Sequence, residues 1–168
     1  RNVAASGGIM TTGNFPGRAR NIDELRQDID KATSLLAGPM RLNLHETYGD
    51  FGGAFVDRDQ CSPEHFQSWM EWAKERGMKL DFNSTSFSHP NSGTLSLSNP
   101  DKAVRDFWIE HTKRCRRIAD AMGAYQGDPC IMNIWVHDGS KDYTVEKYRY
   151  RQIFKESLDE IMKEDLPN

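Results

Sequence analysis

The sequence has 168 residues, of which 37% are hydrophobic and 28% are charged, and its formal net charge is −3. These values exclude a disordered or fibrous chain and fit one domain with an ordinary core. No apolar run approaches the roughly 20 residues of a membrane span, and the N-terminus lacks a signal-peptide core, so a cytoplasmic protein with no membrane contact is expected.

The first half of the chain predicts two helices and two strands. Residues 21–37 place apolar side chains at intervals of three and four, between an asparagine cap and a Gly-Pro stop, which predicts an amphipathic helix. A short strand is predicted at 41–45, a helix with a serine cap at 62–77, and a second strand at 78–83. The apolar faces expected of the two helices consist of Ile22, Leu25, Ile29, Ala32, Leu35 and Leu36, and of Phe66, Trp69, Met70 and Ala73.

The second half continues the same alternation. A loop rich in Ser, Pro and Gly is predicted at 86–100, and loops of this length inside a domain are usually functional or mobile. A long helix follows at 101–122, then a strand at 130–136 and a last helix at 144–164. The inner faces expected of these helices consist of Val104, Phe107, Trp108, Cys115, Ile118, Ala119 and Met122, and of Tyr148, Ile153, Phe154, Leu158 and Ile161.

The basic residues and the cysteines point to no partner and no cross-link. One dense basic cluster lies in the long helix, and in a chain with a sequence pI near 6.0 it predicts a solvated helix face and no nucleic-acid binding. The cluster consists of Lys113, Arg114, Arg116 and Arg117. The cysteines are odd in number and share no CxxC spacing, so buried, reduced thiols are expected. They are Cys61, Cys115 and Cys130.

The alternation of helices and strands predicts an α/β fold with a parallel sheet, either doubly wound or an arc of a (β/α)8 TIM barrel. Neither GxGxxG after a strand nor GxxxxGK[ST] occurs, which disfavours a nucleotide-binding doubly wound sheet. His45, Asn83 and Trp135 fall at carboxyl ends of strands, where barrel enzymes gather their chemistry. Three strands cannot close a barrel, so residues 1–168 are expected to form a single incomplete domain of a longer chain.

Six ordered segments resemble the L-rhamnose isomerase family, and together they cover the chain from about Gly7 onward. They are GGIMTTGNFPGRARN, RLNLHETYGDF, LDFNSTSFSHP, LSLSNPD, FWIEHTKRCRRIA and MNIWVHDGSKDYTVEKY. The resemblance implies a xylose-isomerase-like (β/α)8 barrel, of which this chain would form the part after the first strand, with about three parallel strands and four helices. Met10 and Phe15 depart from the family's pattern in the N-terminal loop.

The resemblance further implies a cytoplasmic homotetramer that interconverts L-rhamnose and L-rhamnulose with the help of a divalent cation, usually Mn²⁺. In the family, the metal ligands come from later strands than those of this chain. The catalytic and metal-binding residues are therefore expected beyond Asn168, no metal ligand is assigned within the chain, and the chain alone is expected to be inactive.

Four residues are assigned to the sugar pocket through the resemblance. His45 is expected to hydrogen-bond a substrate hydroxyl, and Trp135 to form an aromatic wall. Phe82 and Phe87 are candidates for an apolar surface near the C6 methyl of the deoxysugar, and which of the two faces the sugar stays open. An aromatic contact suits the methyl end, whereas the hydroxyls require directional donors and acceptors.

Each assignment has a structural alternative, since His45 also fits a bond to a neighbouring carbonyl and Trp135 fits a barrel core. His137 and Asp138 have the chemistry of a metal pair, but adjacent residues of an extended strand point to opposite faces, which disfavours a shared metal. The other three histidines, His65, His89 and His111, are expected to be structural. The loop at 86–100, which contains His89, could close over the pocket.

Two alternative functions stay open at this point. A different TIM-barrel sugar isomerase or epimerase would share the alternation and the polar strand ends. A non-catalytic half-barrel that assembles with a partner would cover its open edges by association.

Overall fold

Three strands of alternating apolar and polar residues pair in parallel at the centre of the protein. A computed structural model describes residues 16–17, 19–138 and 145–168. The strands lie side by side in the order in which they occur in the sequence. They are β1 (Arg41–His45), β2 (Lys79–Thr85) and β3 (Met132–Trp135). The parallel sheet predicted from the sequence is thus confirmed.

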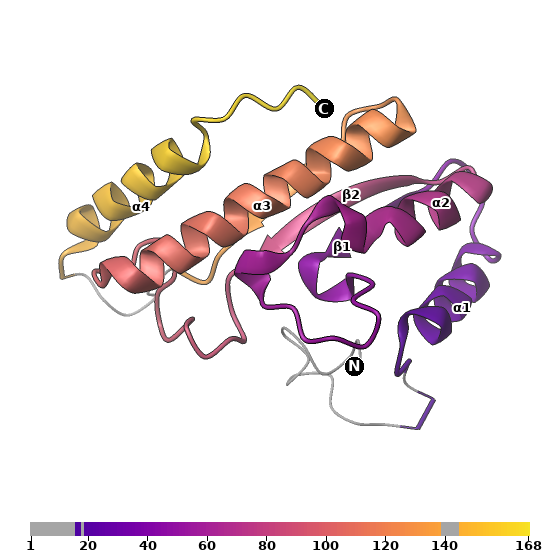
Figure 1. Ribbon diagram of the computed structural model, residues 1–168, viewed down its shortest axis with the longest axis horizontal. Coiled ribbons are helices and arrows are strands. Elements are labelled where there is room, and N and C mark those ends of the chain that lie inside the picture. The colour runs from indigo at the N-terminus through magenta and orange to yellow at the C-terminus, as the bar shows by residue number, and fades with distance from the viewer. Residues whose placement is uncertain (1–15, 18, 139–144) are drawn as a thin grey trace.

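Four α-helices alternate with these strands, as predicted (Figure 1). They are α1 (Ile22–Thr33), α2 (Gln67–Glu75), α3 (Lys102–Gln126) and α4 (Lys147–Ile161). Short 3-10 turns precede α2 and follow β1, at Pro63–Phe66, Arg58–Gln60 and Glu46–Tyr48. Within the described ranges, no helix combines the length and the hydrophobicity needed to cross a membrane.

The two faces of the sheet differ in chemistry. Leu44 and Leu80 are 1% exposed and Phe82 is fully buried, and all three lie in the core between the sheet and the helices. Because side chains alternate along a strand, His45 and Asn83 point to the face of the sheet that is turned away from the helices. The register pairs His45 with Asn83 and Thr85 with Trp135, so these polar and aromatic residues meet at the carboxyl edge of the sheet.

All four helices cover the same face of the sheet. Side chains of α1, α2 and α3 pack with Leu42 and Leu44 in one cluster, and side chains of α3 and α4 pack with Ile134 in a second. A doubly wound sheet carries helices on both faces, whereas a (β/α)8 barrel carries them only outside. The one-sided packing and the sequential strand order are those of an arc of a TIM barrel, which confirms the predicted fold class.

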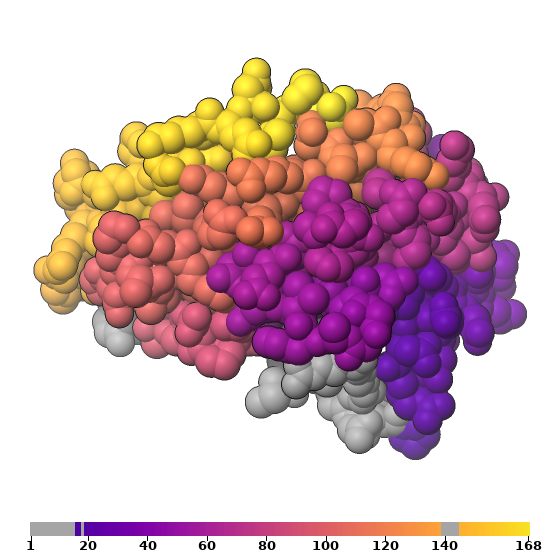
Figure 2. All heavy atoms as spheres, viewed as in Figure 1, coloured from indigo at the N-terminus to yellow at the C-terminus, as the bar shows by residue number. Residues whose placement is uncertain are grey.

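The basic cluster of α3 attaches α4 to the rest of the protein. Lys113 Nζ lies 2.6 Å from Glu160 Oε1, and Arg117 Nε donates to Glu164 Oε2 at 2.9 Å. Arg116 donates to the backbone carbonyl of Ile161 at 2.6 Å, at the carboxyl end of α4. Figure 2 shows α3 (orange) and α4 (yellow) in continuous contact along one side of the molecule. These cations are therefore occupied by intramolecular acceptors.

Two sequence expectations about helix faces were wrong. The first helix ends at Thr33 and not near residue 37, so Leu35 and Leu36 are 75% and 63% exposed. Its last turn is closed by hydroxyl bonds, since Thr33 Oγ1 donates to the carbonyl of Ile29 at 2.8 Å. In α4, Tyr148 is 75% exposed because it lies in the first turn, before the helix reaches α3.

The three cysteines are free and buried, as expected from their spacing. Burial raises the pKa of Cys61 and of Cys130 to about 12, and that of Cys115 is also raised by burial. These thiols are therefore inert packing groups at neutral pH.

We expect Phe82→Ala to lower the free energy of unfolding by about 3–5 kcal/mol, because it opens a cavity in the core. The Phe82 ring is fully buried and meets Phe66 edge-on at a centroid distance of 5.1 Å. Phe87→Ala is the matched control and should cost about 1 kcal/mol, the value of one partly exposed aromatic contact. Urea denaturation followed by circular dichroism measures both. Equal losses for the two variants would contradict this assignment of the core.

Candidate functional site

Four ring-bearing side chains meet at the carboxyl edge of the sheet. The indole of Trp135 is 49% exposed and lies 5.6 Å from the His45 ring and 5.0 Å from the Phe87 ring, centroid to centroid. Tyr48, in the turn after β1, lies 5.5 Å from His45 on another side. We call His45, Tyr48, Phe87 and Trp135 the strand-end cluster. Three of the four residues that the sequence assigned to a sugar pocket are therefore neighbours.

The fourth, Phe82, lies elsewhere. Its ring points to the helix-facing side of β2 and packs against Phe66 in the core. Phe87 lies five positions after Phe82. The chain leaves the strand after Thr85, and the side chain of Phe87 turns back toward Trp135. The structure thus brings Phe87, and not Phe82, to the strand-end cluster.

His45 is held by two polar neighbours on the same face of the sheet. Its Nδ1 lies 2.8 Å from Thr85 Oγ1, and its Nε2 lies 3.2 Å from Asn83 Nδ2. An amide nitrogen only donates, so Nε2 accepts from Asn83 and Nδ1 carries the proton that Thr85 Oγ1 accepts. Burial, together with the positive charge of Arg58, lowers the pKa of His45. The ring is therefore neutral at neutral pH and has a fixed orientation.

The loop at 86–100 is attached to the end of β3 by Asp138. One carboxylate oxygen of Asp138 accepts from the backbone N–H and the hydroxyl of Ser96, at 2.7 and 2.5 Å. The other accepts from the backbone N–H and the hydroxyl of Ser98, at 2.6 and 2.8 Å. The Nε2 atom of His137 lies 3.3 Å from the carbonyl of Gly93 in the same loop. Asp138 has no lone pair left for a metal, and the His137-Asp138 pair is a loop anchor.

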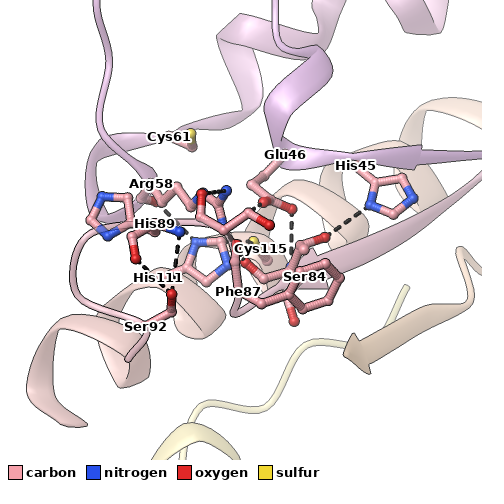
Figure 3. A network of polar contacts seen from close by, with 12 residues as sticks. His45, Glu46, Arg58, Cys61, Ser84, Phe87, His89, Ser92, His111 and Cys115 are labelled. Atoms are coloured by element: carbon pink, nitrogen blue, oxygen red, sulfur yellow. Dashed lines mark hydrogen bonds and ion pairs between the residues drawn. The ribbon is translucent and has the colours of Figure 1, made fainter. Parts of the chain in front are cut away.

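A buried ion pair lies near His45 and Phe87 of the strand-end cluster (Figure 3). Glu46 follows His45 directly and is fully buried, and Arg58 is 7% exposed. Glu46 Oε1 lies 3.6 Å from the Arg58 guanidinium, and Glu46 Oε2 accepts from the backbone N–H of Thr85 at 3.0 Å. Burial raises the pKa of Glu46 to about 7, although the charge of Arg58 opposes the shift.

One group of possible metal ligands occurs among the described residues, and it does not fit a manganese site. Glu46, His111 and Cys115 offer ligand atoms within 4.8 Å of one another, all of them buried. Glu46 Oε2 already accepts from the Thr85 N–H, and Oε1, which has no hydrogen-bond partner, lies 3.6 Å from the Arg58 guanidinium, whose charge would repel a metal.

The imidazole of this group offers only its Nε2 atom, and the thiol does not suit manganese. His111 Nδ1 donates to the carbonyl of Arg58 at 3.1 Å, and Cys115 Sγ lies 3.8 Å from both ring nitrogens, so it does not face one lone pair. Burial lowers the pKa of His111 to about 3, so its ring is neutral and buried with its neighbours. Manganese prefers carboxylate and water oxygens over a thiol.

Comparison with known proteins identifies the family. The family model described as L-rhamnose isomerase (RhaA) matches residues 1–168, the whole chain. The chain belongs to the L-rhamnose isomerase family. It is 68% identical over 165 residues to the L-rhamnose isomerase of Bacteroides thetaiotaomicron, covering 98% of this chain and 40% of that protein.

Two further relatives agree with this assignment to the L-rhamnose isomerase family. The L-rhamnose isomerase of Mannheimia succiniciproducens is 53% identical over 97% of this chain, and that of Rhodopirellula baltica is 48% identical over 98%. The chain covers 39% and 38% of these two proteins, so it spans about two fifths of the length of its relatives. The two departures from the family's pattern, Met10 and Phe15, lie outside the described residues.

Sequence reasoning missed four residues around the site of this L-rhamnose isomerase family member. Glu46 and Tyr48 come directly after the predicted strand at 41–45. Their position at the strand end is the one signal in the sequence that could have found them. Thr85 was missed because β2 extends two residues beyond the predicted end at 83. Arg58 lies in the loop segment VDRDQ, where nothing in the sequence distinguishes it from a solvated arginine.

We expect Asp138→Asn to release the loop at 86–100. Asparagine keeps the shape but has only one acceptor oxygen, so the N–H and hydroxyl of one serine lose their partner, and bonds to a charged acceptor contribute about 1.5–3 kcal/mol. Amide hydrogen exchange at Ser96 or Ser98 should accelerate at least about tenfold.

The control is Asp106→Asn, which removes a carboxylate from an exposed ion pair with Lys102 on α3. Exposed pairs contribute little, so this variant should leave the exchange of the loop unchanged. Unchanged exchange in the Asp138 variant as well would mean that the loop does not depend on this carboxylate.

Proposed function

We propose that this chain supplies the sugar-binding arc of an L-rhamnose isomerase, which interconverts L-rhamnose and L-rhamnulose. The observation that supports this most directly is the strand-end cluster of a chain that belongs to this family. Trp135 is half exposed at the carboxyl edge of the sheet, with His45 and Phe87 against it. In TIM-barrel enzymes that edge carries the active site. We further propose a cytoplasmic homotetramer in which residues 1–168 are one part of the barrel domain.

The chemistry of the cluster suits a 6-deoxy sugar. The Phe87 and Trp135 rings meet almost at right angles, at an interplanar angle of 79°, and form an apolar corner in which a methyl group would be shielded from water. His45 offers the polar side of the same surface. A sugar hydroxyl would replace Asn83 at Nε2, the longer of the two His45 contacts, while Thr85 keeps the ring oriented.

The proposed reaction requires a divalent cation and catalytic residues in addition to this sugar-binding arc. A divalent cation, Mn²⁺ in our proposal, would polarise the oxygens on C1 and C2, the two carbons between which hydrogen moves. The group of Glu46, His111 and Cys115 does not fit such an ion for the reasons given above, so we assign the metal ligands and the catalytic residues to parts of the enzyme outside this chain. The arc binds and orients the sugar, and its neutral His45 leaves the proton transfer to those other residues.

A hybrid enzyme tests this function. Residues 1–168 replace the matching segment of the full-length Bacteroides thetaiotaomicron relative, which is 68% identical over 165 residues. The hybrid should convert L-rhamnose to L-rhamnulose in the presence of Mn²⁺, with the unaltered relative as the positive control. A hybrid that melts and assembles like the relative but neither binds nor converts L-rhamnose would overturn the proposal.

In the hybrid, we expect Phe87→Ala to reduce the preference for the methyl group. L-Mannose has the same configuration with a hydroxyl on C6, and one buried methyl group accounts for about 1–3 kcal/mol of discrimination. The ratio of kcat/KM for L-rhamnose to that for L-mannose should fall about tenfold. Tyr148→Ala removes an exposed ring on α4 and is the matched control, with an unchanged ratio. A ratio unchanged in both variants would remove Phe87 from the pocket.

A further inference from the structure

A single guanidinium fixes the backbone on which the strand-end cluster is built. Arg58 Nη1 donates to the carbonyl of Thr85 at 2.6 Å and to that of Phe87 at 2.7 Å. Its Nη2 donates to the carbonyl of Ser88 at 3.3 Å. These three carbonyls belong to the segment where β2 ends and the chain turns into the loop.

Glu46 holds the same segment from the other side. Its carboxylate accepts from the backbone N–H of Thr85, whose carbonyl is bound by Arg58. The two polar groups of Thr85's backbone are thus held by the two members of one buried ion pair. The Thr85 hydroxyl in turn accepts from His45, so the orientation of that ring depends on where the pair holds Thr85.

The segment held in this way is strained at its end. Ser88 has a φ of 56°, in the left-handed region that L side chains rarely adopt. Such a conformation costs of order 1 kcal/mol or more and persists only where surrounding contacts impose it. The bonds from Arg58 to Phe87 and Ser88 supply such contacts, and they direct the Phe87 ring toward Trp135.

The backbone and the side chain of Arg58 are themselves held in place by neighbouring residues. The Asp57 carboxylate accepts from the backbone N–H of Arg58 at 2.7 Å, and His111 donates to its backbone carbonyl at 3.1 Å. The guanidinium carbon lies 5.8 Å above the Trp108 ring. A buried ion pair contributes little net stability compared with apolar side chains of similar size, so stability alone does not account for this one, whereas its bonds to the Thr85–Ser88 backbone give it a geometric role.

We propose that Arg58 and Glu46 are positioning residues for sugar recognition, which set the orientation of His45 through Thr85 and the position of Phe87 through its backbone carbonyl. The inference rests on the proposed function for its sugar. The two residues touch no substrate and act from beside the cluster. Their removal changes how well the pocket selects its ligand more than it changes the rate of the chemical step.

The test is Arg58→Lys in the hybrid enzyme. A lysine keeps the charge opposite Glu46, but it cannot offer the planar fork that reaches three carbonyls. The kcat/KM ratio of L-rhamnose to L-mannose should fall about tenfold through a higher KM for L-rhamnose, with kcat within about threefold of the unmutated hybrid. In a Phe87→Ala background the same substitution should change the ratio by less than about twofold, because the two residues act as one unit.

Arg105→Lys is the matched control. Arg105 also donates to two backbone carbonyls, those of Asn99 and Pro100, but at the other end of the same loop. This variant should leave the ratio and the KM unchanged. Glu46→Gln gives an independent arm, since it keeps an acceptor for the Thr85 N–H and removes the charge; it should lower the ratio less than Arg58→Lys does.

A second readout separates this inference from the proposed function. Amide hydrogen exchange at Phe87 and Ser88 should accelerate about tenfold in Arg58→Lys and not in Arg105→Lys, whether or not the hybrid converts L-rhamnose. If the hybrid is inactive but exchange responds in this way, the function fails and the positioning of the segment stands. If exchange and the sugar preference both match the unmutated hybrid, the positioning role is refuted.

Discussion

The alternation of side chains along three parallel strands is the constraint on which the rest of the structure depends. In β1 it sends Leu44 to the helices and His45 to the opposite face, and in β2 it separates Phe82 from Asn83 in the same way. Because the strands are parallel, their polar faces end at one common edge. A shift of one residue in register would bury the polar set and expose the apolar one, so core packing and site geometry are fixed by the same pairing.

Periodic sequence patterns predict the helices and strands, but they do not predict contacts between residues that are far apart in the sequence. The strands, the helices and most of their apolar faces follow from local patterns, which also place His45 and Trp135 at strand ends. Their assignment to a sugar pocket came from the family resemblance. The two phenylalanines show the limit. Both occur in DFNSTSF, and only the true end of β2 at Thr85 decides that Phe82 enters the core and Phe87 turns to Trp135.

A polar residue that resembles a metal ligand in the sequence can have all of its acceptor sites occupied by hydrogen bonds within the protein. The carboxylate of Asp138 accepts four bonds from Ser96 and Ser98, which leaves it no lone pair for a metal. Arg58 shows the opposite case, since an arginine in an unremarkable loop binds three carbonyls. A partner 27 residues away in sequence leaves no local signal, so such roles become visible only when the chain is folded.

The positive charge of Arg58 also affects which step of the proposed reaction this part of the enzyme can perform. The Arg58 guanidinium, together with burial, keeps His45 neutral, and a neutral imidazole recognises hydroxyls without competing for the proton that moves during isomerisation. The same positive charge makes this edge unfavourable for a divalent cation, because among the described residues only Glu46 forms an ion pair with it, and the pKa of Glu46 is itself raised to about 7. An arc of this kind is suited to hold the sugar's apolar end and some of its hydroxyls. In the proposed enzyme, a divalent cation would be better held away from this buried guanidinium.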